Sequence, residues 1–168
     1  VVNKRYLNDG MFVRQRPVEQ NFQRTHADAM ILLDPDLYYR TLDMTESTFN
    51  SNDASYWHKS IGGYHAAKLR RYQEVIEAHI SPEMIRLQKA VISNGGDLSA
   101  VKADSLYPVL NMLNMKYILM QTSEKEKVPV FNPYAMGNGW FVSNINWVDN
   151  ADDELAAIGK VNRSHTAI

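Results

Sequence analysis

The chain has 168 residues, a formal net charge of −1 and no cysteine. This length suffices for one domain with a substantial core, and 45% hydrophobic with 22% charged residues is typical of a globular protein. The lack of cysteine excludes disulfides, thiolate metal sites and cysteine nucleophiles, and the near-neutral charge argues against a general nucleic-acid binder. No apolar run approaches the roughly 20 residues that a membrane-spanning helix needs.

Residues 1–30 show little hydrophobic periodicity, so we expect an extended N-terminal arm here. Asn8-Asp9-Gly10 and Pro17 indicate turns within this arm. Thr25, followed three residues later by Asp28, predicts a capped helical turn.

We expect residues 31–168 to form a single domain. The chain begins at Val1 without a signal-peptide pattern and ends on the β-prone residues Thr166-Ala167-Ile168. We therefore expect it to be a segment of a longer protein.

A strand is predicted over Leu37–Met44, where side chains alternate after the turn signal Asp34-Pro35-Asp36. The residues that follow, 45–55, are polar and indicate a loop. A helix is predicted over Tyr64–Ile80 because its apolar residues fall on one stripe. Ser81-Pro82-Glu83 then predicts the start of a second helix, with serine as its N-cap.

The second helix is expected to end at Asn94-Gly95-Gly96, and a third, short helix to run through residues 106–113. Asn114 can adopt the left-handed conformation that ends this helix. Strands are predicted directly afterwards over Met115–Gln121 and over Val128–Phe131.

The last strong pattern is the alternation over Gly139–Val148, which predicts a strand with one almost wholly apolar face. Trp140 and Trp147 lie on opposite faces of it, so one of the two is expected to face solvent or another surface. The acidic residues that follow predict the start of a helix, and residues 165–168 a closing strand. Together these elements predict an α+β fold, a mostly antiparallel mixed sheet with three to four helices packed mainly on one face.

Ser55–Ile76 holds the densest group of chemically active side chains. Gly62 and Gly63 allow two interpretations. Glycines at a helix entrance can let backbone N–H groups meet an anion, with charge added by nearby lysine and arginine side chains. The other interpretation, which residue chemistry favours, is a tight turn whose positive φ requires glycine.

No metal site is expected. His58 and His65 are seven residues apart, but Gly62-Gly63 makes one continuous helix between them improbable, and only Asp53 is a nearby carboxylate. His65 more simply bonds to backbone or to a neighbouring loop. The acids around Asp152 are explained by a helix start rather than by a calcium loop. Asp34 and Asp36 fit a turn better than a pair of glycosidase carboxylates.

Three blocks of sequence carry a family resemblance: SYWHKSIGGYHAAKLRRYQEVI (Ser55–Ile76, the first block), LNMLNMKYILM (Leu110–Met120, the second) and NPYAMGNGWFV (Asn132–Val142, the third). In this order they resemble the extracytoplasmic region of bacterial YfhO-like membrane proteins, large multi-pass proteins grouped with glycosyltransferases of the GT-C type. NKRYL near the start and YYRTLDM also fit the pattern. Trp57 departs from it, standing where members often carry a smaller aromatic residue.

The resemblance implies an enzyme that transfers a polyprenyl-phosphate-linked sugar outside the cytoplasmic membrane. The catalytic carboxylate is expected near the first membrane spans, which this chain does not contain, so we expect no catalytic residue and no cofactor here. The implied partners are the transmembrane part of the parent chain and a glycan or lipid-linked sugar, with no nucleic acid. The implied location is the extracytoplasmic face of the bacterial membrane, periplasmic in a Gram-negative cell.

Two roles follow from the resemblance. In the first, the domain assists acceptor binding or shapes the active site. A sugar or phosphate is then held in a cleft that includes the Gly62-Gly63 loop and the third block, with Asn138. The side chains expected to contact that ligand are His58, Lys59, His65, Lys68 and Arg71. In the second, the domain is a non-catalytic interaction or scaffold domain, and the same residues only fix the loop to the sheet.

Overall fold

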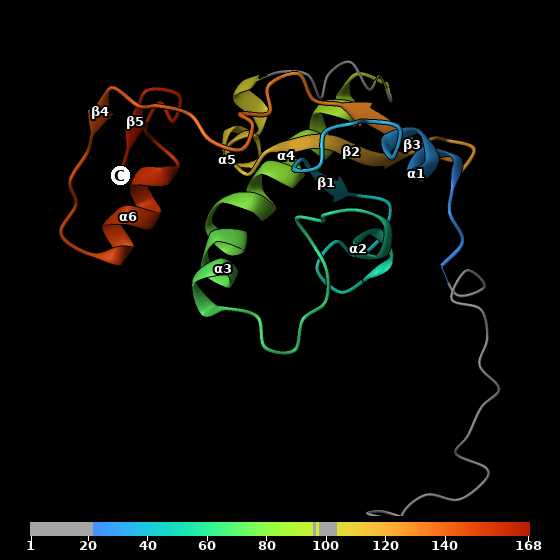
Figure 1. The fold of residues 1–168 in the computed structure, drawn as a ribbon, viewed down its shortest axis with the longest axis horizontal. Coiled ribbons are helices and arrows are strands. Elements are labelled where there is room, and N and C mark those ends of the chain that lie inside the picture. Colours follow the sequence, from blue (N-terminus) through green and yellow to red (C-terminus); the bar gives the residue numbers. More distant parts are fainter. Residues whose placement is uncertain (1–21, 96, 98–103) are drawn as a thin grey trace, which may run out of the picture.

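The computed structural model describes residues 22–95, 97 and 104–168 (Figure 1). The turns predicted at Asn8-Asp9-Gly10 and Pro17, and with them most of the expected N-terminal arm, lie outside these residues. The predicted cap at Thr25 is confirmed: its hydroxyl accepts from the Asp28 N–H at 3.2 Å, and the Asp28 carboxylate accepts from the Thr25 N–H at 2.8 Å. This reciprocal pair begins helix α1 (His26–Ile31).

The central sheet has the strand order β1-β2-β3, with β1 at Arg40–Asp43, β2 at Met115–Gln121 and β3 at Lys127–Phe131. The two later strands are confirmed where they were predicted, and the first is shorter than Leu37–Met44. The α+β class is confirmed, but the expectation of a mostly antiparallel sheet is wrong. β2 runs parallel to β1 and antiparallel to β3, because the long helical segment between β1 and β2 returns the chain to the same end of the sheet.

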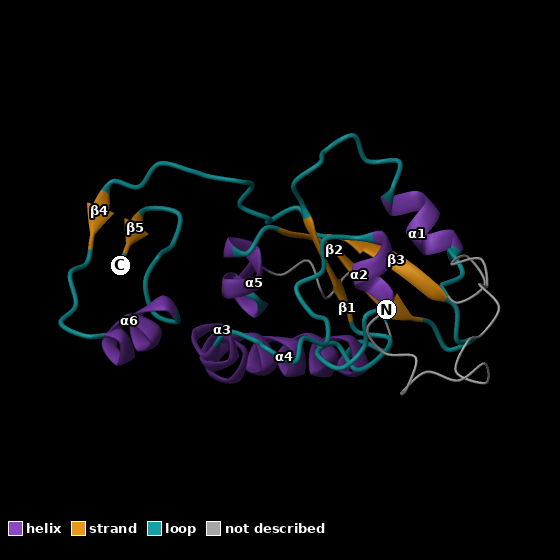
Figure 2. Cartoon of the chain, turned by 60° about the horizontal axis from the view of Figure 1, so that its bottom comes forward, coloured by secondary structure: helices purple, strands orange, loops and turns teal. Residues whose placement is uncertain are grey.

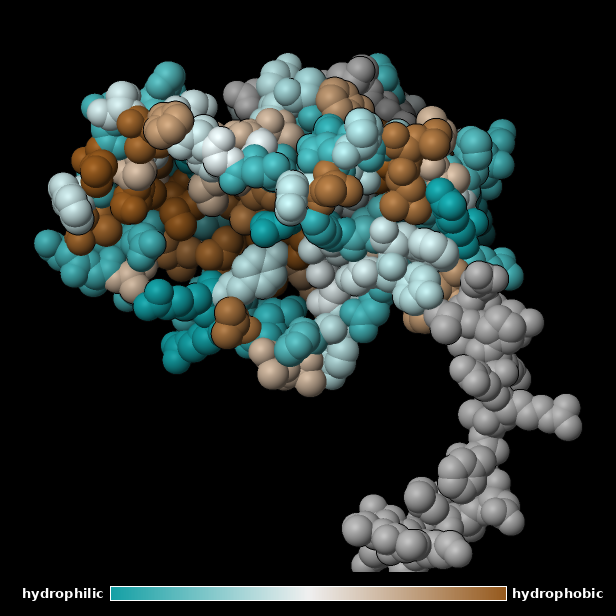
Figure 3. All heavy atoms as spheres, in the orientation of Figure 1, coloured by the Kyte–Doolittle hydropathy of each residue, from teal (hydrophilic) through white to brown (hydrophobic). Residues whose placement is uncertain are grey.

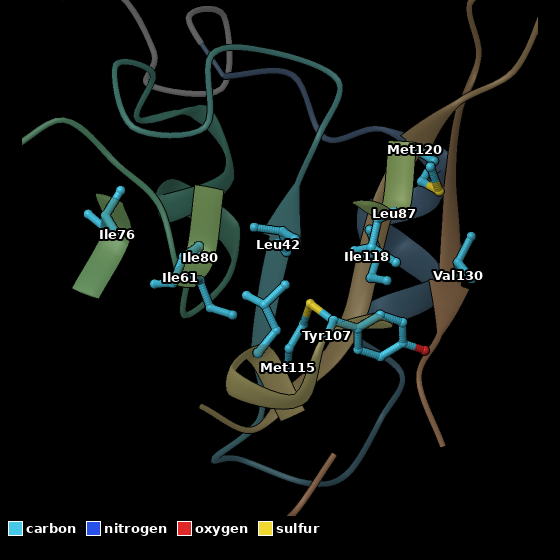
Figure 4. Packing of buried hydrophobic residues seen from close by; sticks show 11 residues of the cluster. Leu42, Ile61, Ile76, Ile80, Leu87, Tyr107, Met115, Ile118, Met120 and Val130 are labelled. Atoms are coloured by element: carbon cyan, nitrogen blue, oxygen red, sulfur yellow. The ribbon is translucent and has the colours of Figure 1, made fainter. Parts of the chain in front are cut away.

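Side chains on the two faces of this sheet belong to different clusters. On β2, Ile118 packs into the larger core, whereas Leu119, one residue on, packs with Ala27 and Ile31 of α1. Helices therefore lie on both faces. The long helical segment over residues 70–93 lies on one face (Figure 2), and α1 contacts the other. Figure 4 shows how the larger cluster is assembled from strands and helices, with these buried members: Leu42, Ile61, Ile76, Ile80, Leu87, Tyr107, Leu110, Met115, Ile118, Met120 and Val130.

The long helix is continuous where two helices were predicted. Helix α3 (Arg70–Val75) leads through the π-helical turn η3 (Ile76–Ile80) into α4 (Ser81–Ser93). Pro82 has no N–H and its ring would crowd a preceding carbonyl, and the wider π-helical turn just before it lets the helix continue. The predicted break at Ser81 is therefore wrong.

The start of this helix is also later than the predicted Tyr64. Leu69 is still extended, with φ −59° and ψ 128°, and the chain before it forms turns. Gly95 has φ +65° just after α4, as the predicted glycine-rich helix end requires.

The third predicted helix is confirmed as a 3₁₀ turn η5 (Asp104–Leu106) followed by α5 (Pro108–Met112). Asn114 has φ +58°, the left-handed conformation that was expected before β2. The sequence missed helix α2 (Asp53–Trp57), which overlaps the end of the segment that was expected to be a polar loop.

The C-terminal unit contains β4 (Asn144–Ile145), α6 (Ala151–Ile158) and β5 (Thr166–Ala167), with β4 and β5 paired in parallel (Figure 1). The predicted closing strand and acidic helix start are confirmed, and Asn150 caps α6 by accepting from the next two acidic residues' N–H groups. The long strand predicted over Gly139–Val148 is reduced to two residues. Trp147 is 86% exposed, so one tryptophan of the pair does face outward.

Among the described residues, no helix has both the length and the hydrophobicity needed to cross a membrane.

Candidate functional site

His58 follows helix α2 and is buried. Its Nε2 lies 2.9 Å from Asp28 Oδ1, and the other oxygen of Asp28 accepts from the N–H and the hydroxyl of Thr25 at 2.8 and 2.6 Å. Burial raises the pKa of Asp28, but these hydrogen bonds outweigh it and hold that pKa below its ordinary value. An ionised carboxylate can only accept, so Nε2 carries the proton and donates to it. His58 thus joins the first block to α1.

The residues after His58 extend the central sheet. Thr41 of β1 donates its N–H to the Lys59 carbonyl at 2.9 Å, and the Ile61 N–H donates to the Thr41 carbonyl at 3.0 Å. The Lys59 ammonium donates to the Leu37 carbonyl and lies 4.5 Å from the centre of the Tyr38 ring. Lys59 therefore attaches its segment to the turn that precedes β1.

Gly62 and Gly63 make the tight turn that residue chemistry favours. A Cβ on Gly62 would lie 2.0 Å from the carbonyl oxygen of Thr48, and Gly63 has φ +111°. The backbone N–H groups of this turn are already bound within the protein. Those of Gly62, Gly63 and Tyr64 donate to the Ser60 hydroxyl, the Thr48 carbonyl and the Asn52 side chain. A bound anion would have to displace these acceptors.

The remaining predicted ligands contact different parts of the molecule. His65 is exposed, and its Nδ1 accepts from the Ala67 N–H at 3.1 Å. The Lys68 ammonium lies 5.2 Å from the centre of the Phe49 ring. Arg71 is exposed on α3 and lines a cavity of about 110 Å³ between α3 and α6.

The cavity that Arg71 lines is lined by none of the other four predicted ligands. Asn138, predicted on the other side of the cleft, instead accepts from the Asn114 side chain at 2.9 Å, and Asn114 also donates to the Tyr38 carbonyl at 3.1 Å. Lys59 and Asn138 are thus both linked to the segment around Tyr38.

The second and third blocks are joined by buried asparagines. The Asn132 side chain donates to the Asn111 side chain at 2.7 Å and to the Met115 carbonyl at 2.6 Å. The Met136 N–H of the third block also donates to the Asn111 carbonyl, at 3.0 Å. Asn111 and Asn132 are each 2% exposed, so both depend on these protein partners for their hydrogen bonds.

Asp34 and Asp36 both bind Lys116, whose ammonium lies 2.6 and 3.3 Å from their carboxylates. The Tyr117 hydroxyl also donates to Asp34 at 2.6 Å. The hydrogen bond from Lys116, and to a smaller extent that from Tyr117, lowers the pKa of Asp34 to about 2. This pair of carboxylates thus fastens the turn before β1 to β2.

A second acidic group, which sequence reasoning did not single out, lines a cavity of about 230 Å³ beside α1, α2, β1 and β3. The Lys127 ammonium lies 3.4 Å from Asp43 and 3.0 Å from Glu46. Its hydrogen bond lowers the pKa of Glu46, whereas burial and the Glu46 charge raise the pKa of Asp53. Two aromatic side chains, Phe22 and Trp57, also line this cavity, as does Asp28.

Within the part of the chain that the structure describes, no three or more histidine and carboxylate side chains are grouped so that they could hold a metal ion.

Comparison of the chain with protein-family models, with curated proteins and with solved structures found no match in any of the three. The roles of these residues are therefore assigned from their contacts.

Proposed function

We propose that this chain is a non-catalytic scaffold domain on the extracytoplasmic face of a YfhO-like bacterial membrane protein, where it stabilises the membrane part of that protein. The parent would belong to the glycosyltransferases that use polyprenyl-phosphate-linked sugars. The family assignment is supported by the three blocks, which follow the family pattern in order over much of the chain. The scaffold role is supported by what the residues of these blocks contact.

The observation that carries the scaffold role is the use of hydrogen-bonding groups in the Gly62-Gly63 turn. All three N–H groups from Gly62 to Tyr64 donate to protein acceptors, and buried His58 donates to Asp28. A ligand site needs several polar groups that converge on one cavity. Here the turn N–H groups, His58 and Lys59 instead bind neighbouring loops, strand β1 and helix α1.

One feature favours the alternative role, acceptor binding. Trp57, a first-block residue, lines the cavity of about 230 Å³ together with Asp43, Glu46 and Asp53. Aromatic rings stack on sugar rings, and carboxylates accept hydrogen bonds from hydroxyl groups. An acceptor that binds to this domain would therefore be expected at Trp57 rather than at the predicted basic residues.

The test uses the full-length parent protein in cells from which the natural copy has been deleted. The variant His65→Ala/Lys68→Ala/Arg71→Ala removes three predicted ligands that do not tie buried segments together. Protein abundance and glycosylation of the cell envelope are measured for each strain. We expect the triple variant to keep normal abundance and normal glycosylation. In the control His58→Ala, we expect glycosylation to fall in proportion to the loss of protein.

Loss of glycosylation from the triple variant at normal abundance would overturn the scaffold proposal. The Trp57→Ala variant separates the two roles. If Trp57→Ala keeps normal abundance but loses glycosylation, acceptor binding replaces the scaffold role, whereas unchanged glycosylation supports the scaffold role.

A further inference from the structure

The C-terminal unit, residues 139–168, is described throughout and contains no buried residue. Its helix α6 buries no side chain, whereas α4 and α5 each bury several residues. In Figure 1 the unit stands at one end of the molecule, beyond α3 and α5. Segments with few buried apolar contacts open at a smaller free energy than the core of a protein. The unit therefore lacks the packing that holds the central sheet and the long helix together.

The boundary between this unit and the rest of the chain is incompletely filled. A cavity of about 430 Å³ is lined by Trp140, Ile158 and Val161 of the unit and, from the other side, by Met112 of α5. The cavity of about 110 Å³ lies between α3 and α6. In Figure 3, hydrophobic residues line the recess between the unit and the rest of the molecule. Side chains that face a cavity lack the dispersion contacts of a packed core, so packing holds the unit only weakly.

Hydrogen bonds within the unit join its two ends. Trp140 Nε1 donates to the Arg163 carbonyl at 2.8 Å, and the N–H groups of Ser143 and Asn144 both donate to the His165 carbonyl at 3.0 Å. The pairing of β4 with β5 adds to these bonds. None of them involves the rest of the chain, so the unit can keep its internal bonds while its position changes.

The chain enters the unit at Gly139. Asn138, just before it, accepts from the Asn114 side chain at 2.9 Å and is thereby attached to the end of α5. Nothing lies within 4 Å of the place that a Cβ on Gly139 would occupy, and residues 139–147 are all exposed. The backbone at this glycine can therefore absorb changes in φ and ψ without a clash, as a hinge must.

His79 attaches the unit to the long helix. It lies in the π-helical turn η3, and its Nε2 lies 2.7 Å from the Leu155 carbonyl oxygen of α6. A carbonyl can only accept, so Nε2 carries the proton and donates it. Gly159, just after α6, lies against the same ring: a Cβ there would be 2.9 Å from His79 Cε1. A second link is electrostatic, because the Arg163 charge offsets part of the rise that burial causes in the pKa of Glu83 on α4.

We propose that the C-terminal unit is a flap, which moves away from the long helix as one body about Gly139 and is held closed by the hydrogen bond from His79 to Leu155. The movement separates Met112 from the unit and so opens the cavity of about 430 Å³. The apolar side chains on the inner side of the unit, Trp140 among them, then become accessible. The flap thus controls access to the largest apolar surface that the unit holds against α5.

The test measures distances between pairs of spin labels by pulsed electron paramagnetic resonance. The chain has no cysteine of its own, so labels attach only to introduced ones. The pair Lys89→Cys/Asp152→Cys places labels at exposed positions on α4 and α6. We expect one distance from the closed flap and a second, longer distance from the open flap. The pair Asp152→Cys/Ser164→Cys lies within the unit and should show a single distance in every variant.

Two variants weaken the attachment from opposite sides. His79→Ala removes the donor to Leu155, and Gly159→Ala pushes the His79 ring away from it. Each should raise the ratio of open to closed flap about fivefold, which corresponds to the loss of one hydrogen bond. The control Lys160→Ala removes an exposed side chain next to Gly159 and should leave the ratio unchanged.

A single, unchanged distance between α4 and α6 in the wild type and in both variants would overturn the proposal. An equal shift in Lys160→Ala would also overturn it, because the effect would then not come from His79. If the distance within the unit broadens together with the distance between α4 and α6, the unit unfolds rather than moving as one body, and the flap is excluded. The proposal is independent of the scaffold role, since it uses none of the five predicted ligands.

Discussion

His58 donates a buried hydrogen bond of 2.9 Å to Asp28, thirty residues earlier in the chain, and so ties the start of the first block to helix α1. The His58 side chain is fully buried and the Asp28 side chain is 8% exposed. A buried carboxylate keeps its charge only while hydrogen bonds replace water, and here Thr25 and His58 provide them. His58 was predicted to contact a sugar or phosphate, but its side chain links the first block to helix α1.

The Gly62-Gly63 turn should not tolerate side chains. In Gly62→Ala, the Cβ would meet the Thr48 carbonyl oxygen at 2.0 Å, so the backbone must move, and we expect a loss of about 1–3 kcal/mol in the free energy of unfolding. Gly63→Ala should lose about 1–2 kcal/mol because φ is +111°. Gly139→Ala is the control, since nothing lies within 4 Å of the added carbon. Urea unfolding measures all three, and equal stability would contradict the tight packing of this turn.

Asn132 should be a strong contributor to stability. The Asn132→Ala variant removes two buried hydrogen bonds, to the Asn111 side chain and to the Met115 carbonyl, at a cost of about 1–3 kcal/mol. Asn138→Ala, in the same block, removes an exposed acceptor, and the Asn114 side chain that donated to it keeps its bond to the Tyr38 carbonyl, so we expect a cost of less than about 1 kcal/mol. Thermal unfolding compares the two. If Asn138→Ala were the more damaging change, the buried contacts would not be the main link between the second and third blocks.

Asp34 should make the stability of the chain depend on acid pH. Lys116 and Tyr117 lower its pKa to about 2 in the folded protein, against about 3.9 in an unfolded chain. The ionised form is therefore favoured by folding above pH 4, and this contribution is lost as the pH falls from about 4 to about 2. Asp34→Asn should cost about 1 kcal/mol at pH 7 and much less at pH 2. As a control, the exposed Asp149→Asn should differ little from the wild type in free energy of unfolding at either pH. A difference between Asp34→Asn and the wild type that stayed the same from pH 7 to pH 2 would contradict the lowered pKa of Asp34.

Elements whose hydrogen bonds are local could be predicted from the sequence. The Thr25 cap and the Asn114 helix end depend on neighbouring residues and were predicted correctly. Strand Met115–Gln121 was also predicted correctly, from its apolar run, although its parallel partner β1 is distant in the sequence. The predicted strand over Gly139–Val148 shrank to two residues, because the alternation of its side chains is not matched by burial: residues 139–147 are all exposed. The predicted helix break at Ser81 was wrong because a π-helical turn, which is wider than an α-helical turn, precedes Pro82 and lets the helix continue. No residue type in Ile76–Ile80 predicts such a turn.

The candidate site was less predictable, because its contacts join residues far apart in the chain. Burial of His58 and its bond to Asp28 depend on how α1 packs on the sheet, which residue type cannot reveal. The same is true of Glu83, which is buried on α4 and accepts from the N–H groups at the start of α5. The glycine pair was a partial exception: adjacent glycines are a local signal for a turn, and Gly63 has a positive φ, whereas Gly62 is required by the close approach of the Thr48 carbonyl.

The most direct test of the central claim, that the first block holds the fold together rather than a ligand, is the free energy of unfolding of His58→Ala measured beside that of His65→Ala. Removing His58 leaves the buried Oδ1 of Asp28 without its donor, while Thr25 still binds the other oxygen, and this should cost about 3 kcal/mol. The loss of exposed His65 should cost less than about 0.5 kcal/mol. In the variant Asp28→Asn/His58→Ala the two losses should not add, because both remove the same interaction. A His58→Ala chain as stable as the wild type would contradict the account.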